Sequence, residues 1–265
     1  MSKRMRVFAG PNGSGKSSII KKILDTDVQK GVKLDFGIYI NADDIAKDLL
    51  KKGCLFPKYT ITFIEDEFFE IVEASGLIKD DFTLDQFKGC IELSDDRLTL
   101  PRKFIENQED KVHERVAQIV ADYLRKKLLL EDKKFSFETV FSHVGKVDII
   151  KQATAKGYKV YLYFVSTEHP SINVYRIKKV RVKQKGHDVP EKKIIDRYYR
   201  SMDLLYDAAQ NVYQSYFFDN SKEGGDHTMF AHFKLNPDGE KVWDENDPKI
   251  FPEWFKAYYS AKIKK

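Results

Sequence analysis

Short apolar runs alternate with amphipathic stretches along most of the chain. The first run covers residues 6–9, and a second covers residues 36–40, where nearly every side chain is apolar, as in buried parallel strands. Between them, residues 17–24 repeat their apolar side chains at helical spacing. The strongest strand signal is the run Tyr-Lys-Val-Tyr-Leu-Tyr-Phe-Val at residues 158–165. This order predicts strands and helices that follow one another in turn.

The remaining elements continue this alternation. Residues 42–52 and 146–156 predict helices, each followed by a glycine of the kind that ends helices. Residues 229–235 and 240–243 flank Asn-Pro-Asp-Gly, a turn sequence, and predict a terminal hairpin. The other expected elements are strands at 135–137 and 215–219 and helices at 171–183 and 191–210. The pattern predicts an α/β fold with a mainly parallel sheet and helices on both faces.

Residues 54–134 depart from this regular alternation. They mix short apolar runs with acidic clusters before a stripe of period 3.6 begins. The stripe is formed by Val112, Val116, Ile119, Val120, Tyr123, Leu124 and Leu128. We find no internal repeat and no low-complexity linker. The sequence therefore predicts a single domain, residues 1–265, with a helical insertion near residues 54–134.

Composition excludes several classes of protein. Of the 265 residues, 42% are hydrophobic and 13% aromatic, which a disordered chain would not show. No stretch approaches the roughly 20 apolar residues of a membrane span, and the basic N-terminus lacks the apolar run of a secretory signal. The two cysteines form no disulfide framework or zinc pattern. The net charge of +5 suits phosphate ligands but argues against a general nucleic-acid face. We expect a cytoplasmic protein.

The most specific motif is Gly-Pro-Asn-Gly-Ser-Gly-Lys-Ser at residues 10–17, which fits G-x-x-x-x-G-K-[ST]. In such a loop the glycines let backbone N–H groups point at phosphate oxygens, and the following helix adds its positive end. Lys16 would reach the β and γ phosphates, and the Ser17 hydroxyl would bind Mg²⁺. The alternative is a glycine turn with an incidental lysine, but the motif lies between a predicted strand and a predicted helix. We expect ATP, or less strongly GTP, to contact Gly10, Pro11, Asn12, Gly13, Ser14, Gly15, Lys16, Ser17 and Ser18.

The rest of the chain favours a kinase among P-loop proteins. The Leu-Ser-Gly-Gly-Gln signature of transporter ATPases is absent from the sequence. The strand at 158–165 ends in Ser-Thr-Glu rather than in the aspartate of a motor or switch ATPase. Asp219 does end a strand, and it is either a Mg²⁺ ligand or a residue with a loop-capping or base-proximal role. The sequence thus predicts a P-loop kinase-like three-layer fold.

Asp43 is a candidate general base. It follows the strand at 36–40, and ligands of open parallel sheets bind beyond the carboxyl ends of the strands. A carboxylate there could accept the proton of an attacking hydroxyl. Equally, Asn41 or Asp43 could cap the helix that begins here. The sequence leaves both interpretations open.

Glu138 and Thr139 repeat this arrangement after another strand. A strand that stayed buried would continue with apolar residues, whereas a carboxylate and a hydroxyl could bind hydroxyl or amide groups of an acceptor. A run of basic residues then extends from Arg176 to Arg200. It is either a solvated helix face or a source of cations for the transferred phosphoryl group.

Taken together, these segments resemble the zeta-toxin family of P-loop kinases, in its zeta-like branch. Besides the loop, the matching segments are Asn-Ala-Asp at 41–43, Phe-Glu-Thr at 137–139, Gly-His-Asp-Val-Pro at 186–190, Arg-Tyr-Tyr-Arg-Ser at 197–201 and Asp-Asn-Ser at 219–221. They span most of the chain in order, except residues 54–134 and the C-terminal tail. Gly-His-Asp-Val-Pro followed by Arg-Tyr-x-Arg-Ser is more specific than the loop alone.

The resemblance implies an ATP-dependent phosphotransferase. Founding members phosphorylate the 3′-hydroxyl of UDP-N-acetylglucosamine and are neutralised by a small antitoxin. If the roles of the family are carried over to this sequence, Lys16 and Ser17 hold phosphates and Mg²⁺, and Asp43 is the base. Glu138 and Thr139 lie in the sugar-nucleotide site, and Arg176 with Arg181 or Arg197 contacts phosphates.

One spacing differs from the family pattern, which places its two helix arginines four residues apart. Arg176 and Arg181 are five apart, and one residue turns a side chain by about 100° around an α-helix. The sequence therefore predicts that at most one of the two is in register. The alternatives to a zeta-type kinase are a metabolic or nucleoside kinase with another acceptor, and a nucleotide-binding switch module.

Overall fold

The computed structural model describes residues 3–29, 31–181, 189–222, 228–244 and 247–263. The chain divides into two compact units. The first combines Met1–Asp35 with Glu138–Lys265, and the second is Phe36–Phe137. The second unit thus begins before the predicted insertion, and the description as a single domain stays a prediction.

A seven-stranded sheet has the strand order β12-β11-β10-β9-β1-β8-β4. β1 runs parallel to β9 and β9 to β10, while β4 runs parallel to β8; β11 and β12 complete the sheet in antiparallel fashion. The bounds are β1 Arg4–Ala9, β4 Ile38–Ile40, β8 Phe135–Thr139, β9 Lys159–Ser166, β10 Gln214–Asp219, β11 Thr228–Leu235 and β12 Lys241–Trp243. The predicted α/β fold, mainly parallel sheet and terminal hairpin are confirmed.

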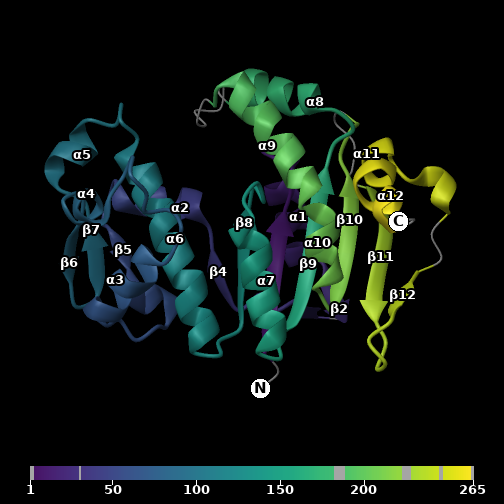
Figure 1. Cartoon of the computed structure of the whole chain (residues 1–265), viewed down its shortest axis with the longest axis horizontal. Helices are drawn as coiled ribbons and strands as arrows, with labels where there is room; N and C mark the ends of the chain where they lie inside the picture. Colours follow the sequence, from purple (N-terminus) through teal and green to yellow (C-terminus); the bar gives the residue numbers. More distant parts are fainter. Residues whose placement is uncertain (1–2, 30, 182–188, 223–227, 245–246, 264–265) are drawn as a thin grey trace. The chain divides into compact units, whose positions relative to one another are not determined.

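The first unit has helices on both faces of its strands. α7 (Gly145–Ala155) and α10 (Leu205–Gln210) pack on β9, and α1 (Lys16–Asp25) packs on β1 from the opposite face (Figure 1). The crossover from β9 to β10 is formed by α8 (Pro170–Tyr175), η2 (Arg176–Arg181), α9 (Glu191–Asp203) and α10. Smaller elements are β2 (Asp27–Gln29), β3 (Val32–Lys33), η3 (Pro248–Ile250), α11 (Glu253–Phe255), η4 (Lys256–Ser260) and α12 (Ala261–Ile263).

Two predicted helices differ from the expectation. The stretch at 171–183 begins as an α-helix and continues over Arg176–Arg181 as a π-helix, whose hydrogen bonds join residues five apart. The spacing of Arg176 and Arg181 is therefore one π-turn, and the 100° offset of an α-helix does not apply. The stretch at 191–210 is two helices that are interrupted at Leu204.

The second unit is built around a long helix and an aromatic core. α6 (Val112–Leu130) carries the predicted apolar stripe. Tyr123 on α6 contacts the rings of Phe56 and Phe68 at centroid distances of 6.1 and 4.7 Å. The other elements are α2 (Ala42–Leu49), β5 (Cys54–Leu55), η1 (Phe56–Tyr59), α3 (Glu65–Glu73), α4 (Leu84–Lys88), β6 (Glu92–Ser94), β7 (Arg97–Thr99) and α5 (Arg102–Glu106), with a small sheet in the order β5-β7-β6.

A second aromatic cluster anchors the C-terminal segment to the first unit. Phe217 of β10 contacts Phe255 at 4.9 Å and Tyr259 at 5.4 Å between ring centroids. Further members are Phe230, Phe233, Trp243, Phe251 and Trp254. The hydrophobic effect of burying these rings fixes the tail against the sheet, close to the carboxyl end of β10. Within the described parts of the chain, no helix is both long and apolar enough to cross a membrane.

Candidate active site

The loop between β1 and α1 has a backbone that only glycine adopts easily. Gly10 has φ 144°, and a Cβ there would lie 2.0 Å from the carbonyl oxygen of Val165 on β9. Gly13 has φ 77°, and a Cβ there would lie 2.9 Å from the carbonyl oxygen of Asn173. Both glycines therefore allow the loop to pass close to its neighbours, as a phosphate-binding loop requires.

The Lys16 side chain lies inside this loop. Its Nζ donates to the carbonyl oxygens of Gly10 at 3.0 Å and of Pro11 at 2.9 Å, and only 7% of the residue is exposed. An ammonium group is thus fixed within the curve of the backbone. Phosphate oxygens bound there would replace carbonyl oxygens as its acceptors.

The Ser17 hydroxyl faces Glu138. Ser17 Oγ lies 3.2 and 3.3 Å from the two carboxylate oxygens of Glu138 at the end of β8. The preceding residues of β8, Phe135 to Phe137, are buried and hold the strand in the sheet. Thr139 differs, because its hydroxyl accepts from the backbone N–H of Phe141 at 3.2 Å. The sequence had placed both residues with the acceptor, and their roles stay predictions.

The Ser17 and Glu138 oxygens fit a magnesium ion that is also bound by phosphate. Mg²⁺ prefers oxygen ligands and is commonly held by one or two carboxylates together with substrate phosphates. Among the residues that the structure describes, no three His, Cys, Asp or Glu side chains cluster as a protein-only metal site would. A metal at this position would need the nucleotide to complete its ligands.

Two asparagines brace the loop from outside. Asn173 Nδ2 on α8 donates to the carbonyl oxygen of Asn12 at 2.6 Å, and Asn220 Nδ2 after β10 donates to that of Ser14 at 2.8 Å. These two hydrogen bonds hold the backbone of the loop in place at Asn12 and at Ser14. Asn220 belongs to a segment that the sequence had singled out, but no sequence signal pointed to Asn173.

Asp219 is a loop-capping residue, which was one of its sequence interpretations. Its carboxylate accepts from the Ser221 N–H at 3.1 Å, from the Ser221 hydroxyl at 2.7 Å and from the Trp254 indole N–H at 3.0 Å. Because three protein groups donate to its carboxylate, Asp219 helps to hold the loop that carries Asn220. This argues against the other interpretation, a Mg²⁺ ligand.

In the second unit, Asn41 and not Asp43 caps α2. The Asn41 side chain accepts from the backbone N–H of Asp43 at 2.8 Å, in the geometry of an N-cap. Asp43 itself is exposed on the first turn of the helix. Capping therefore does not explain the carboxylate at this position, and its role as a base stays a prediction.

The predicted phosphate-binding arginines differ in their placement. Arg176 Nη2 donates to the carbonyl oxygen of Lys222 at 3.2 Å. Arg197 is half-buried on α9, and Arg200 is exposed with its Nε directed to the carbonyl oxygen of Asp196. The side chain of Arg181 and residues 186–188 lie outside the described part of the chain.

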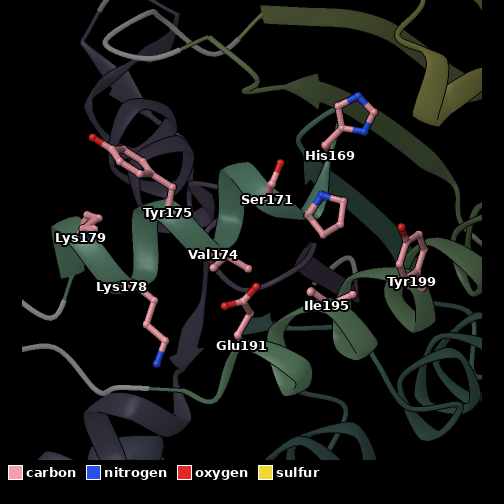
Figure 2. A pocket seen from close by; sticks show the side chains of 10 residues that line it. His169, Ser171, Val174, Tyr175, Lys178, Lys179, Glu191, Ile195 and Tyr199 are labelled. Carbon is pink, nitrogen blue, oxygen red and sulfur yellow. The ribbon is translucent and has the colours of Figure 1, made fainter.

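A groove of about 630 Å³ lies between α8–η2 and α9 (Figure 2). His169 and Tyr199 lie at one end and Lys178 and Lys179 at the other, with Glu191 between them. On α8, the residues that line the groove are different from Asn173, which faces the loop. The groove is therefore separate from the loop at residues 10–17.

Comparison with models of protein families gives no match, and comparison with curated proteins gives none either. Among solved structures, the chain is similar to AvrRxo1-ORF1:AvrRxo1-ORF2 with sulphate ions, with a TM-score of 0.50 and 16% identity over 97% of this chain and 63% of that one. The same complex with ATP matches with a TM-score of 0.49 and equal identity and coverage. The PezAT toxin-antitoxin system of Streptococcus pneumoniae matches with a TM-score of 0.45 and 12% identity, over 97% of this chain and 78% of that one.

The first of these similarities shows the fold. The chain shares the α/β fold of that structure, with a mostly parallel sheet flanked by helices, as the sequence predicted. It spans 63% of the length of that chain, so the activity and partners of the larger protein do not transfer with the fold.

Proposed function

We propose that the protein is an ATP-dependent phosphotransferase of the zeta-toxin type, which phosphorylates a hydroxyl group of a small acceptor. The observation that carries this proposal is the buried ammonium of Lys16 inside the loop at residues 10–17. A fixed cation surrounded by backbone amides is suited to stabilise the charge that develops on a transferred phosphoryl group.

Magnesium would be held by the Ser17 hydroxyl on the side of the loop that faces Glu138. When bound, Mg²⁺ neutralises charge on the phosphate oxygens. Glu138 would accept hydrogen bonds from the ligands of the metal or from the acceptor, and Ser17 would change its partner from Glu138 to the metal. Glu138 is the one charged residue of β8, and the buried residues before it hold the strand in the sheet.

Asp43 would accept the proton of the attacking hydroxyl, because its carboxylate follows a strand and is not used as a helix cap. The resemblance of the sequence to zeta toxins supports a nucleotide sugar such as UDP-N-acetylglucosamine as acceptor, with Thr139 near it. It also supports a small antitoxin partner. Arg176, Arg181 and Arg197 would supply further positive charge.

The test is an ADP-release assay with purified protein and Mg-ATP, with and without UDP-N-acetylglucosamine. We expect ADP release that depends on the acceptor and yields a phosphorylated sugar nucleotide detectable by mass spectrometry. If ADP release instead required a different metabolite from a cell extract, the protein would still be a kinase, but its acceptor would not be UDP-N-acetylglucosamine. Slow release without any acceptor would contradict the proposal and favour a nucleotide-binding switch.

A further inference from the structure

The turn that follows β8 has an unusual backbone. Phe141 has φ 62°, in the left-handed region that a bulky side chain rarely adopts. Among the described residues, three other non-glycine residues have a positive φ, and these are exposed: Thr60, Lys111 and Asp132. Phe141 is instead fully buried, with its ring edge-on to that of Phe164 on β9 at 6.4 Å between centroids. Strained backbone of this kind persists only where surrounding contacts hold it, and such positions cluster at functional sites.

Two hydroxyl groups hold the turn in this conformation. Thr139 Oγ1 accepts from the Phe141 N–H at 3.2 Å. Ser201 Oγ on α9 donates to the carbonyl oxygen of Val140 at 2.9 Å, across a separation of 61 residues in the sequence. Because Ser201 is fully buried, water does not compete for this contact. The turn is therefore fixed by its own side chain and by a helix that is distant in the sequence.

α9 is a firm support, because it also contacts the end of β9. Tyr198, three residues before Ser201 on the same helix, donates from its buried hydroxyl to the carbonyl oxygen of Thr167 at 2.6 Å. Thr167 directly follows β9. In the sheet, β9 and β8 lie on either side of β1, from which the loop at residues 10–17 leads to α1. α9 thus joins the carboxyl ends of the two strands that flank the origin of the loop.

The turn begins next to the carboxylate that faces Ser17. Glu138 is the residue before Thr139, and its two carboxylate oxygens lie 3.2 and 3.3 Å from Ser17 Oγ. The conformation of the turn sets the direction in which β8 ends, and hence where the Glu138 side chain starts. A carboxylate that helps to hold a metal ion depends on such supporting contacts for its orientation.

We infer that Ser201 is a positioning residue for Glu138. By holding the turn, it keeps the Glu138 carboxylate beside the Ser17 hydroxyl, where a magnesium ion bound to the nucleotide phosphates would lie. The inference rests on the proposed function, because it assumes that Mg-ATP binds at the loop. Ser201 acts on the backbone of the turn and is not itself a ligand of metal or nucleotide. Loss of its hydroxyl should therefore weaken the response to Mg²⁺ and leave the binding of metal-free ATP unchanged.

A double-mutant cycle tests whether Ser201 acts through Glu138. Calorimetric titration with ATP at a series of Mg²⁺ concentrations gives the concentration at which half of the magnesium-dependent gain in ATP affinity is reached. This Mg²⁺ midpoint would be measured for the wild type, Ser201→Ala, Glu138→Gln and the double variant. The matched control is Ser136→Ala, which removes a fully buried hydroxyl from β8 itself; in the described part of the chain that hydroxyl has no hydrogen-bond partner. Urea unfolding gives the stability of each variant.

We expect the Mg²⁺ midpoint to rise at least about tenfold with Glu138→Gln and about tenfold with Ser201→Ala, whereas Ser136→Ala should stay within about twofold of the wild type. In the Glu138→Gln background, Ser201→Ala should add less than about twofold, because there is no carboxylate left to position. ATP affinity without Mg²⁺ should stay within about twofold of the wild type for Ser201→Ala and Ser136→Ala.

Effects that multiply fully in the double variant would overturn the inference, since Ser201 would then act independently of Glu138. An unchanged midpoint in Ser201→Ala would also overturn it. Should Ser201→Ala not fold, Thr139→Val tests the same turn, because it removes the acceptor of the Phe141 N–H and keeps the shape of the side chain. It should raise the midpoint in the wild-type background and not in the Glu138→Gln background. Any other result would contradict the role of the turn.

Failure of the proposed function would look different. Lys16→Ala should lower ATP affinity with and without Mg²⁺, since its ammonium contacts the phosphates directly. If the wild type and Lys16→Ala bound ATP equally, without any response to Mg²⁺, the proposed function and the inference would both be overturned. If Lys16→Ala weakened ATP binding while the effects in the cycle multiplied, the proposed function would stand and only the inference would be overturned.

Discussion

Asp43 and Asp44 are adjacent exposed carboxylates at the start of α2, and only one of them is expected to take part in the reaction. Asp44 pairs with Lys47 at 3.2 Å on the helix surface. We predict that Asp43→Asn lowers the rate of phosphoryl transfer by roughly 10²–10⁴ and leaves ATP affinity nearly unchanged, because the amide keeps the shape but cannot accept a proton. Steady-state kinetics together with calorimetry would measure both quantities.

The matched control for this prediction is Asp44→Asn, which removes a neighbouring charge and should keep activity near that of the wild type. Asn41→Ala should instead lower the free energy of unfolding by about 1 kcal/mol, because it removes the side chain that caps α2. An Asp43→Asn variant with full activity would remove Asp43 from the mechanism.

Glu138 can be assigned to the metal or to the acceptor by one substitution. Because its carboxylate faces the Ser17 hydroxyl, we predict that Glu138→Gln raises the Mg²⁺ concentration needed for half-maximal activity at least tenfold. Titration of activity with Mg²⁺ at saturating ATP would show this shift. If the acceptor KM rises instead and the Mg²⁺ requirement stays the same, Glu138 belongs to the acceptor site.

At the level of single residues, the sequence identified the residue types but did not determine several of their hydrogen-bond partners. The loop at residues 10–17 was predictable, because its glycine spacing is dictated by backbone geometry. The choice between Asn41 and Asp43 as the cap, and among the possible roles of Asp219, depended on hydrogen bonds that sequence does not encode locally. Asn173 was missed because an asparagine within a helical stretch carries no recognisable signal.

Among the elements, β12 contains a lysine whose charge is costly to bury. Burial lowers the pKa of Lys241 from its ordinary 10.5 to about 8, although its Nζ donates to Gln210 Oε1 at 2.7 Å and to the Tyr259 hydroxyl at 3.3 Å. Between about pH 8 and pH 10.5 the unfolded chain keeps this proton while the folded protein loses it. The contribution of Lys241 to stability therefore rises with pH across this window.

We predict that Lys241→Met stabilises the protein at pH 7 and that this advantage shrinks as the pH rises through the same window. Urea unfolding of both proteins at several pH values would give the difference in the free energy of unfolding. Lys234→Met, which changes an exposed lysine on the neighbouring β11, should show no such pH dependence. If the difference in the free energy of unfolding between Lys241→Met and the wild type did not change with pH, folding would not shift the pKa of Lys241.

The tail element α11 is expected to support the loop at residues 10–17 through Asp219. Trp254→Phe keeps an aromatic ring next to Phe164 and Phe230 but loses the indole N–H that donates to Asp219. We predict a loss of about 0.5–1.5 kcal/mol in the free energy of unfolding and a several-fold weaker ATP affinity, because Asn220 follows Asp219 directly.

Trp243→Phe is the control for that variant, since it makes the same chemical change in the same aromatic cluster away from Asp219. It should lower stability without a comparable effect on ATP affinity. Equal ATP affinities in Trp254→Phe and the wild type would show that the tail does not influence the loop.

Elements with a long periodic pattern were predictable, and short ones were not. The eight-residue strand β9 and the nineteen-residue helix α6 follow directly from their apolar spacing. The strands β5, β6 and β7 have only two or three residues each, too few for alternation to be read. The interruption at Leu204 has no proline or glycine to announce it.

For the molecule as a whole, the order of elements predicted the class of fold, because alternating strands and helices have few ways to bury their apolar faces. The limits of the two compact units were not predictable. They fall at Phe36 and Phe137, and neither position has the polar, glycine-rich or proline-rich composition of a linker. Local composition indicates which segments are exposed to solvent. The boundaries of the two compact units depend instead on contacts between residues that are distant in sequence.

The π-helix at Arg176–Arg181 changes how this sequence should be aligned with others. A π-turn contains one residue more than the α-turn it replaces, so it absorbs a single-residue insertion without displacing the residues after it. We therefore expect the spacing of five between Arg176 and Arg181 to correspond to a spacing of four in a regular α-helix. We predict that an alignment with zeta toxins needs a one-residue gap between these two arginines. Insertions of this size can therefore hide a shared motif from comparisons that rely on sequence alone.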